Sequence, residues 1–377
     1  MVKWGMGIDR RAFLAGAAAA IAAPEVRAAG SSFTVTDMIG RHVALVGRPS
    51  RIVLLEARDV LTMGVIHPEP AKLIVGWAAV DRIDSDALRQ AYEHQAGHSI
   101  AVVGKLEPGS VSLEAVIALQ PDLVVASAYA DGGDDLFVQR LESLGIPVVF
   151  GSAVTNGDDK GHGDDLSNLM RFWGRILGRE EQAEVYLSFF ADRLSAVGRC
   201  LEGAEPVKTY LEVQSTYADC CWAAGKIVWG TLLAQGGGRS LDAVTSPWFQ
   251  QISAEQLIAE APGLYIASGG GFSIKIRPAI APGLPVETAR QGLRLLAERP
   301  ALSILEMVRQ KRVHGIWTGL VTVPPLNILF VELVAKWAHP DRCAQIDPAG
   351  TLAALNERFL TIGIETPCWV SLRDDQL

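Results

Sequence analysis

Two glutamates, Glu114 and Glu255, occupy the same place in a repeated stretch of the sequence. The 16 residues from Ser112 to Ser127 align with those from Ser253 to Ser268, and eight positions are identical, where composition alone would give roughly one. In each copy the serine is a favourable helix N-cap, and the glutamate in the first turn favours the helix macrodipole. If the two copies belong to two related lobes, each lobe presents one glutamate. The two glutamates could then bind an arginine on each subunit of a two-fold symmetric partner through charge-assisted hydrogen bonds.

A second group of side chains could bind an anionic or planar ligand. Aromatic rings pack against a planar chelate, and arginine or lysine binds its anionic oxygens. The group follows predicted strands, and ligands of open α/β sheets bind beyond the carboxyl ends of the strands. The ligand-binding candidates are Arg58, Trp77, Tyr129, Tyr217, Trp222, Trp248, Lys275, Arg277 and Trp317, with Lys105, Gln214 and Phe272 as further positions. Arg277, which follows Gly269–Gly271, is the favoured contact for an anion, although the three glycines could simply form a turn. Each tryptophan could instead be a core residue.

Motifs for catalysis or for direct metal binding are weak. The sequence has no G-x-S-x-G, H-E-x-x-H or P-loop pattern. His94 and His98 have the spacing to share a metal on a helix, but Gly97 lies between them and no third ligand is evident. The acidic stretch 156–165 lacks ligands where an EF-hand needs them. We expect no catalytic residue, no protein-bound metal and no covalent cofactor; a secreted enzyme on a related two-lobed fold is the alternative.

The five cysteines all lie in the C-terminal half, and an odd count leaves a free thiol or an intermolecular bond. Cys343 and Cys368 are the preferred disulfide pair. Cys220 and Cys221 are adjacent, so they could form a vicinal disulfide, remain two buried thiols, or be one paired and one free. Cys200 is the first cysteine in the chain.

Short apolar strands alternate with helical patterns, which indicates βα units and mainly parallel sheets. A β-hairpin over 33–45 precedes the predicted strands Ile52–Leu55, Lys72–Val75, Ala101–Val103, Leu123–Ala126 and Val148–Phe150. A helical pattern then runs from about 165 to 201, with a possible break near Gly178, and the alternation restarts after Pro206. The sequence therefore predicts an α/β fold of two Rossmann-like lobes (29–162 and 203–377) joined by a single long α-helix (163–202).

Residues 1–28 are interpreted as an export signal. Lys3, Arg10 and Arg11 precede an apolar run over 12–24, and Arg10-Arg11-Ala12-Phe13-Leu14 is typical of a twin-arginine signal. Cleavage is expected after Ala28, and the alternatives are an unstructured basic tail or an amphipathic anchor. The run is shorter than the about 20 residues that a membrane span requires. No cysteine lies near the cleavage site, so no lipid anchor is expected.

The formal net charge of −8 becomes −10 after cleavage, because residues 1–28 carry four basic and two acidic side chains. This acidic balance argues against a general nucleic-acid binder, which normally shows a basic face, and leaves a local basic patch open. The hydrophobic fraction of 49% is ordinary for a globular protein. We therefore expect a soluble, monomeric protein of the bacterial periplasm.

The sequence resembles the class III periplasmic binding proteins, which deliver ferric siderophores, heme or cobalamin to ABC importers. The resemblance covers nearly all of the mature chain, and its most specific motif surrounds Glu114. The segments that carry it are Thr34–Asp37 with Gly40-Arg41, Arg51–Leu55, Leu113-Glu114, Leu119–Val124, Leu144–Val148, Leu177–Glu181, Leu233–Gly237, Ile252–Glu255 and Arg312-Val313.

This resemblance implies a substrate-binding protein that performs no chemistry on its ligand. In the family, the glutamates that match Glu114 and Glu255 bind arginines of the permease dimer, so it assigns a docking role to these two residues. The implied ligand is a metal chelate, foremost a ferric siderophore, with heme or a corrinoid such as cobalamin as alternatives. The ligand would bind in the cleft between the lobes, with modest closure because the connecting helix is stiff.

Overall fold

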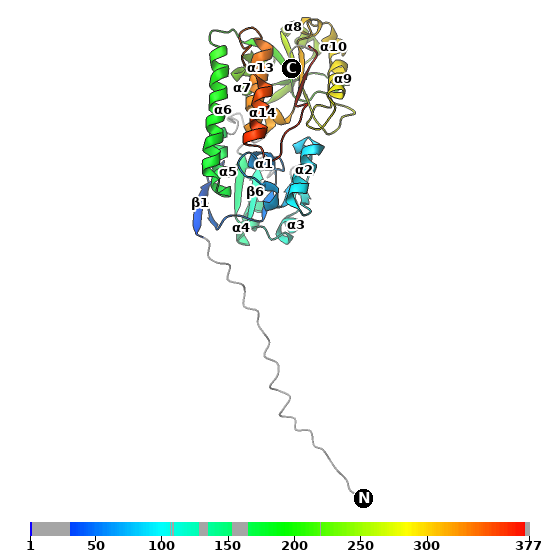
Figure 1. Cartoon of the computed structure of the whole chain (residues 1–377). Helices are drawn as coiled ribbons and strands as arrows, with labels where there is room; N and C mark the ends of the chain where they lie inside the picture. Colours follow the sequence, from blue (N-terminus) through cyan, green and yellow to red (C-terminus); the bar gives the residue numbers. More distant parts are fainter. Residues whose placement is uncertain are drawn as a thin grey trace.

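The computed structural model describes Met1 and residues 31–105, 107, 109–127, 135–152, 165–218 and 220–373. Apart from Met1, the expected export signal lies outside these ranges, as do Tyr129 and nearly all of the acidic stretch 156–165. None of the helices in the described part of the chain combines the length and the apolar character that a membrane crossing requires. The described residues form two α/β lobes connected by a pair of helices (Figure 1).

The N-terminal lobe contains a five-stranded sheet in which every pairing is parallel. Its order is β5-β4-β3-β6-β7, with β3 (Ile52–Leu54), β4 (Ile74–Ala78), β5 (Ala101–Gly104), β6 (Leu123–Ser127) and β7 (Val148–Ser152). The inner strands β3 and β6 are buried throughout, as expected for a parallel sheet covered on both faces. The predicted hairpin is present as β1 (Ser32–Thr36) and β2 (His42–Val46), which pair antiparallel.

Short helices connect these strands. They are α1 (Asp59–Met63), η1 (Pro70–Leu73), η2 (Val80–Ile83), α2 (Asp86–Ala96), α3 (Leu113–Ala118) and α4 (Asp135–Ser143), where η denotes a 3-10 helix. Ser85 and Ser112 cap α2 and α3 by accepting the backbone N–H groups of Leu88 and Ala115. The predicted strand over 72–75 begins only at Ile74, because Pro70 starts the 3-10 turn η1.

The connection between the lobes consists of two helices, α5 (Leu166–Leu177) and α6 (Glu180–Cys200), rather than one uninterrupted helix. The break is at Gly178, whose φ of +65° ends α5 in the left-handed region that glycine adopts readily. Phe172 and Trp173 lie on the buried face of α5. The 21-residue α6 runs along one edge of the molecule (Figure 1).

The C-terminal lobe has a mixed sheet. Its order is β11-β9-β8-β12-β13-β14, and β10 also pairs with β8. The strands are β8 (Val207–Glu212), β9 (Trp222–Ala224), β10 (Gly238–Arg239), β11 (Phe249–Gln251), β12 (Leu264–Gly269), β13 (Val313–Trp317) and β14 (Trp369–Ser371). The central strands β8, β12 and β13 are parallel, as predicted. The short antiparallel strands β9, β11 and β14 were not predicted, because they form by pairing with strands elsewhere in the sequence.

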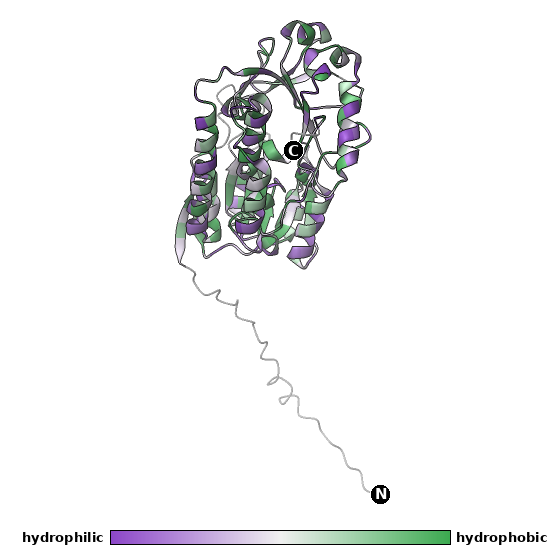
Figure 2. Ribbon diagram, turned by 45° about the horizontal axis from the view of Figure 1, so that its top comes forward, coloured by the Kyte–Doolittle hydropathy of each residue, from purple (hydrophilic) through white to green (hydrophobic). Residues whose placement is uncertain are grey.

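The helices of this lobe surround the sheet and build its core. They are α7 (Trp229–Gln235), α8 (Ala254–Glu260), α9 (Val286–Ala297), α10 (Pro300–Ser303), α11 (Glu306–Arg309), α12 (Gly319–Thr322), η3 (Pro324–Leu326), α13 (Asn327–Ala338) and α14 (Pro348–Arg358). Helix α13 is buried on almost every side. Figure 2 shows hydrophilic residues distributed over the outer helices of both lobes.

The repeated sequence adopts the same structure twice. Helix α3 leads into β6, and α8 leads into β12, which begins 141 positions after β6 in the numbering. Each unit contains one non-glycine residue with positive φ at the matching position, Gln120 (+48°) and Ala261 (+45°), each directly before a proline. In both lobes the repeated strand pairs in parallel with the strand that comes first in the sequence of its sheet, β3 or β8. The lobes therefore share a helix–turn–strand unit in equivalent topology.

The disulfide prediction for Cys343 is wrong. Cys343 bonds to Cys200 at the end of α6, so the bond fastens the connecting helix to the segment after α13. Cys368 is a buried free thiol. Cys220 and Cys221 form a vicinal disulfide just before β9, one of the alternatives that the sequence left open. Sequence separation alone could not identify Cys200 as the partner, because the packing of α6 against α13 brings the two residues together.

Candidate functional site

A cavity of about 630 Å³ lies between the two lobes. Its N-terminal wall consists of residues that follow β3 and β4, including Arg58 and Arg82, together with Ser127 and Ser152 at the ends of β6 and β7. Its C-terminal wall includes Gln214, which follows β8. These positions agree with the rule that ligands of open α/β sheets bind beyond the carboxyl ends of the strands. We refer to this cavity as the cleft.

The N-terminal wall of the cleft carries a cluster of three charged side chains. The buried Glu56 accepts hydrogen bonds from Arg58 Nε and Nη2, both at 3.2 Å. It also forms an ion pair with Arg82, with 2.8 Å between Nη1 and Oε2. Two of the five N–H donors of Arg58 point to Glu56, so the guanidinium retains donors for a ligand. The cluster therefore holds two arginines in place at the cleft wall.

The local sequence explains why these arginines are well positioned. Strand β3 is buried, and Val60, Leu61 and Met63 anchor the short helix α1 immediately after Arg58. Arg82 belongs to η2, which directly follows β4 and its flanking residue Ala79. Each guanidinium thus extends from a backbone segment fixed to the sheet, which reduces the conformational entropy lost when a ligand binds.

The C-terminal wall is aromatic. Trp229, at the start of α7, lines the cleft together with the neighbouring residues Trp248 and Phe249. Phe190 of α6 also lines it. Trp222 packs edge-to-face against Phe249, with 5.9 Å between the ring centroids. The cleft therefore combines a charged wall on one lobe, with Arg58 and Arg82 beside Glu56 and Asp59, with an aromatic wall on the other.

A buried ion pair holds the loop that carries Gln214. Glu212, at the end of β8, accepts hydrogen bonds from Arg299 at 2.7 and 3.0 Å and from the Tyr265 hydroxyl at 2.5 Å. Arg299 also donates to the carbonyl of Thr216 at 3.0 Å. Because the same guanidinium binds the strand end and the loop beyond it, Gln214 lies on a constrained segment.

The structure separates the predicted ligand-binding residues into groups. Arg58, Gln214 and Trp248 line the cleft. Trp222 does not line it but packs edge-to-face against Phe249, which does. The expected ligand contact is wrong for Trp77 and Trp317, because neither side chain has exposed surface. Trp77 lies in the core, and the Trp317 indole donates to the Asp84 carbonyl of the other lobe at 3.0 Å. Lys275 is exposed on the loop after β12 and does not line the cleft.

Arg277 also differs from expectation. Its Nη2 atom donates to Asp84 Oδ2 and to Thr318 Oγ1, both at 3.1 Å. The anion that it contacts is therefore a carboxylate of the other lobe.

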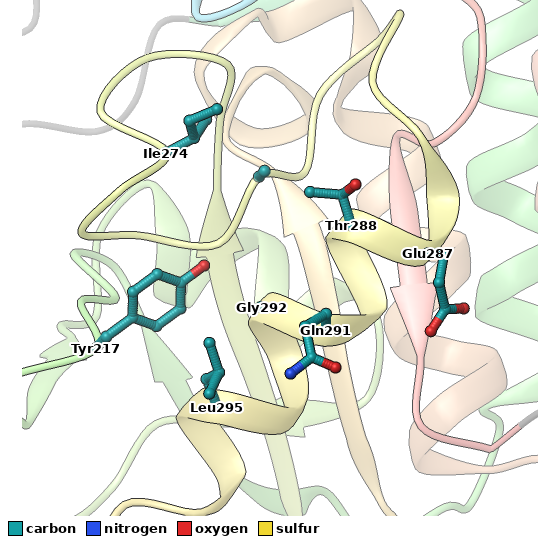
Figure 3. A pocket seen from close by; sticks show the side chains of 8 residues that line it. Tyr217, Ile274, Glu287, Thr288, Gln291, Gly292 and Leu295 are labelled. Atoms are coloured by element: carbon teal, nitrogen blue, oxygen red, sulfur yellow. The ribbon is translucent and has the colours of Figure 1, made fainter.

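Tyr217 faces a separate, open pocket of about 470 Å³ on the C-terminal lobe. Its hydroxyl points toward α9 (Figure 3), where a Cβ on Gly292 would lie 2.7 Å from the tyrosine oxygen. Ile274 and Leu295 supply the apolar part of this pocket. The cleft and this pocket are separate cavities, so Tyr217 does not line the cleft.

Glu114 and Glu255 lie in the first turns of α3 and α8, and both side chains are exposed. Figure 1 places the two helices on different lobes, toward opposite ends of the molecule. The Ser112 hydroxyl donates to Glu114 at 3.3 Å. In α8, the backbone N–H of Glu255 and the Ser253 hydroxyl lower the pKa of the Glu255 carboxyl. Each glutamate therefore presents a carboxylate at the surface in the same local setting.

Several cleft residues were not identified from the sequence. Glu56 and Arg82 follow β3 and β4, so the rule on strand ends could have found them. Phe190 and Asn327 come from α6 and α13, and their place in the cleft depends on how these helices pack. No cluster of three or more histidine, cysteine or acidic side chains suitable for a metal ion occurs among the described residues.

Comparisons with known proteins agree with this architecture. A family model described as periplasmic binding protein matches residues 65–316. The molybdate-binding protein MolA of Haemophilus influenzae is 24% identical over 252 residues, which cover 62% of this chain and 67% of MolA. The vitamin B12-binding protein of Vibrio campbellii is 26% identical over 164 residues, or 43% of this chain. That match spans little more than half of the Vibrio protein, 55% of its length.

Solved structures show the same fold. The TroA-like periplasmic binding protein FepB from Veillonella parvula has a TM-score of 0.76 and 19% sequence identity, with coverage of 90% of this chain and 99% of FepB. Molybdate-bound MolA has a TM-score of 0.68 and 16% identity, with coverage of 88% and 99%. At such identities the likeness concerns the fold, and ligand choice depends on the cleft residues themselves.

Proposed function

Because the chain belongs to the periplasmic binding protein family, we propose that it captures a metal chelate, a ferric siderophore, in the cleft and delivers it to an ABC importer. The observation that carries this proposal is the composition of the cleft: two arginines on one wall and aromatic rings on the other. A ferric siderophore combines anionic oxygen donors with extended apolar or aromatic parts. Arginine binds the former and aromatic side chains pack against the latter.

The size of the cleft supports a ligand of this class over a small oxyanion. Its volume of about 630 Å³ lies within the usual range for sites that bind small organic molecules, roughly 300–1,000 Å³. Molybdate, which MolA binds, has only five atoms and would leave most of this space to water. A chelate would contact both walls at once.

A corrinoid is the second candidate, because the curated relatives include a vitamin B12-binding protein. Heme belongs to the same group of planar metal chelates. The paired arginines favour the siderophore, since a ligand with several anionic oxygens uses both guanidinium groups. No chemistry on the ligand is part of the proposal.

Delivery would use the repeated glutamates. In this proposal Glu114 and Glu255 each bind an arginine of a two-fold permease dimer, one per lobe. Their exposure and matching local structure support this role. We also propose that residues 1–28 direct export by the twin-arginine route and are removed after Ala28, without lipid attachment.

Titration of the purified protein with a panel of chelates tests the ligand. The panel comprises a ferric trihydroxamate, a ferric catecholate, heme, cobalamin and molybdate, with tryptophan fluorescence as the readout because Trp229 and Trp248 line the cleft. A ferric chelate should quench the fluorescence and raise the melting temperature, as any ligand of the native state does. Preference for cobalamin, heme or molybdate would reassign the ligand. No response across the panel, together with turnover of a test substrate, would refute the binding role.

A further inference from the structure

Besides the covalent connection through α5 and α6, hydrogen bonds join the two lobes at the opposite edge of the molecule, and Thr361 of the C-terminal lobe also bonds to Gly64 and Gln95 of the N-terminal lobe. Helices α5 and α6 form the covalent connection along one edge, whereas α2 and α9 lie at the opposite edge (Figures 1 and 2). At that opposite edge, residues just before α2 meet the loop just before α9. We call this contact the Asp84 latch: Asp84 and Ser85 on the N-terminal lobe, and Gly270–Phe272, Arg277, Pro282 and Trp317 on the C-terminal lobe.

Asp84 is the centre of the latch. Its backbone carbonyl accepts two hydrogen bonds from the other lobe, from the Gly271 N–H at 2.9 Å and the Trp317 indole at 3.0 Å. Its carboxylate accepts the Phe272 N–H at 3.2 Å and Arg277 Nη2 at 3.1 Å. The neighbouring Ser85 hydroxyl donates to the Pro282 carbonyl at 3.0 Å.

The sequence of the C-terminal lobe is adapted to this contact. A Cβ on Gly270 would lie 1.9 Å from Asp84 Oδ2, so no side chain fits there while the carboxylate is in place. The triple glycine, which the sequence left open as a simple turn, therefore permits a close approach of backbone to Asp84. Asp84 itself has a φ of +52°, a conformation that aspartate tolerates better than most residues.

The latch is connected to both walls of the cleft. On the N-terminal side, Arg82 lies two residues before Asp84 and lines the cleft. On the C-terminal side, Arg277 also donates to Thr318, the residue before α12, whose Val321 and Thr322 line the cleft. A shift at Asp84 would therefore change the distance between these two walls.

The energetic character of Asp84 suits a positioning role. Its side chain is buried, and this burial raises the pKa of the carboxyl even though Arg277 and the amides of Phe272 and Gly271 lower it. A buried ion pair of this kind contributes little net stability, because desolvation offsets the attraction. What such a pair can supply is a defined geometry.

We propose that Asp84 is a positioning residue that fixes the separation of the two cleft walls at the edge where no covalent connection does so. The consequence for binding rests on the proposed function, in which the cleft holds a chelate. Opening of the latch widens the cleft at the α2–α9 edge, and ligand release follows this opening.

Hydrogen exchange on the ligand-free protein tests the latch. The Gly271 and Phe272 N–H groups have their acceptors on the other lobe, so they exchange only when the latch opens. In Asp84→Ala the Phe272 amide loses its acceptor directly, whereas the Gly271 amide keeps its acceptor, the backbone carbonyl of residue 84, and therefore reports on latch opening. We expect the variant to accelerate exchange at Gly271 at least tenfold and to leave the β12 amides of Tyr265 and Ile266 unchanged. Asp84→Asn, which keeps an acceptor for Phe272, should restore part of the protection. Asp86→Asn is the matched control, since Asp86 is exposed and pairs only within α2.

Two results would overturn the proposal. The first is equal exchange at Gly271 in the wild type and in Asp84→Ala. The second is an equal rise at the β12 amides, because it would indicate that Asp84 only supports global stability. A second experiment measures the rate at which a ferric trihydroxamate and heme are released, by stopped flow. We expect release from Asp84→Ala to be several-fold faster than from the wild type. If the wild type binds neither probe, the ligand assignment fails while the exchange data still decide the latch.

Discussion

The two lobes contain the same helix–turn–strand unit but differ in what surrounds it. In the N-terminal lobe the sheet is entirely parallel, and its loops bring Glu56, Arg58 and Arg82 to the cleft. In the C-terminal lobe antiparallel strands extend the sheet, and Phe249, on one of them, lies with Trp248 at the cleft wall. The shared unit therefore fixes the scaffold, while the divergent edges and loops determine that one lobe supplies charge and the other aromatic surface.

The lobes also differ in their attachment to the connecting helices. The N-terminal lobe packs against α5 through buried side chains such as Phe172 and Trp173. The C-terminal lobe is bonded to the end of α6 by the Cys200–Cys343 disulfide. The disulfide therefore restrains movement between the end of α6 and the C-terminal lobe, whereas packing alone holds the N-terminal lobe against α5 among the described residues.

Removal of that disulfide should have the largest effect on stability. Cys200 and Cys343 are 143 positions apart, and a disulfide that closes so long a loop contributes about 4 kcal/mol. We expect C200A/C343A to lower the free energy of unfolding by about this amount in urea denaturation. The control is C220A/C221A, which removes a bond between adjacent residues and should cost much less. Equal losses of unfolding free energy in the two variants would mean that the Cys200–Cys343 bond does not attach the C-terminal lobe to α6 more strongly than packing alone.

Glu56 and Glu332 form a second contrast, since Glu56 is paired with two arginines whereas Glu332 is buried in α13 beside Thr351. Burial raises the pKa of Glu332 to about 7 from 4.5. The folded state therefore binds the proton more tightly, so this group reduces stability as the pH rises from about 4.5 to 7. At 1.36 kcal/mol per pKa unit, the reduction reaches about 3 kcal/mol above pH 7.

Glu332→Gln should remove this pH dependence. In urea unfolding, the variant should gain about 3 kcal/mol over the wild type at pH 8 and much less at pH 5. The Thr351 hydroxyl can still donate to the amide oxygen. Glu357→Gln, at an exposed position on α14, serves as control and should show no such pH-dependent gain. A gain that is equal at both pH values would contradict the assignment to ionisation.

The sequence predicted those parts of the fold that depend on residues close together in the chain, and it missed those that depend on residues far apart in the chain. The capped helices α3 and α8 and the central strands were predicted, because their apolar patterns and the N-caps Ser112 and Ser253 are local features of the sequence. The three-residue strands β9, β11 and β14 were missed, since they form only by pairing with distant neighbours. For the same reason the partner of Cys200 was missed: only the packing of α6 against α13 determines it.

The cleft was predictable only in part. The rule on strand ends found Arg58, Gln214 and Trp248, but it also selected Trp77 and Trp317, because it does not determine which way a strand side chain points. Arg277 was expected to bind an anionic ligand, whereas its guanidinium binds the Asp84 carboxylate of the other lobe. No local pattern reveals such a contact, because it depends on the relative position of the two lobes.

Charge reversal of the repeated glutamates tests whether the lobes dock equivalently. The double variant E114R/E255R should reduce uptake at least about tenfold, since like charges would face the arginines proposed on the permease. Each single variant should cause a comparable part of the loss, and ligand affinity should not change. Asp86→Arg and Glu287→Arg are matched controls, because both replace exposed acidic residues in first helical turns. A loss of affinity would contradict a docking role, and a loss from one single variant alone would show that the lobes dock differently.

The smallest effects should distinguish the two walls of the cleft. For the best ligand of the panel, Arg58→Gln should weaken binding about tenfold, whereas Trp248→Leu should weaken it about threefold. Salt dependence separates the two, because charge contacts are screened and apolar contacts are not. The affinity of Arg58→Gln should therefore vary less with salt than that of the wild type, while Trp248→Leu keeps the wild-type dependence. The control is Arg89→Gln. Arg89 is a half-buried arginine of α2 that does not line the cleft, so this variant should leave affinity unchanged. Equal salt dependence in all variants would mean that the N-terminal wall does not bind the ligand through charge.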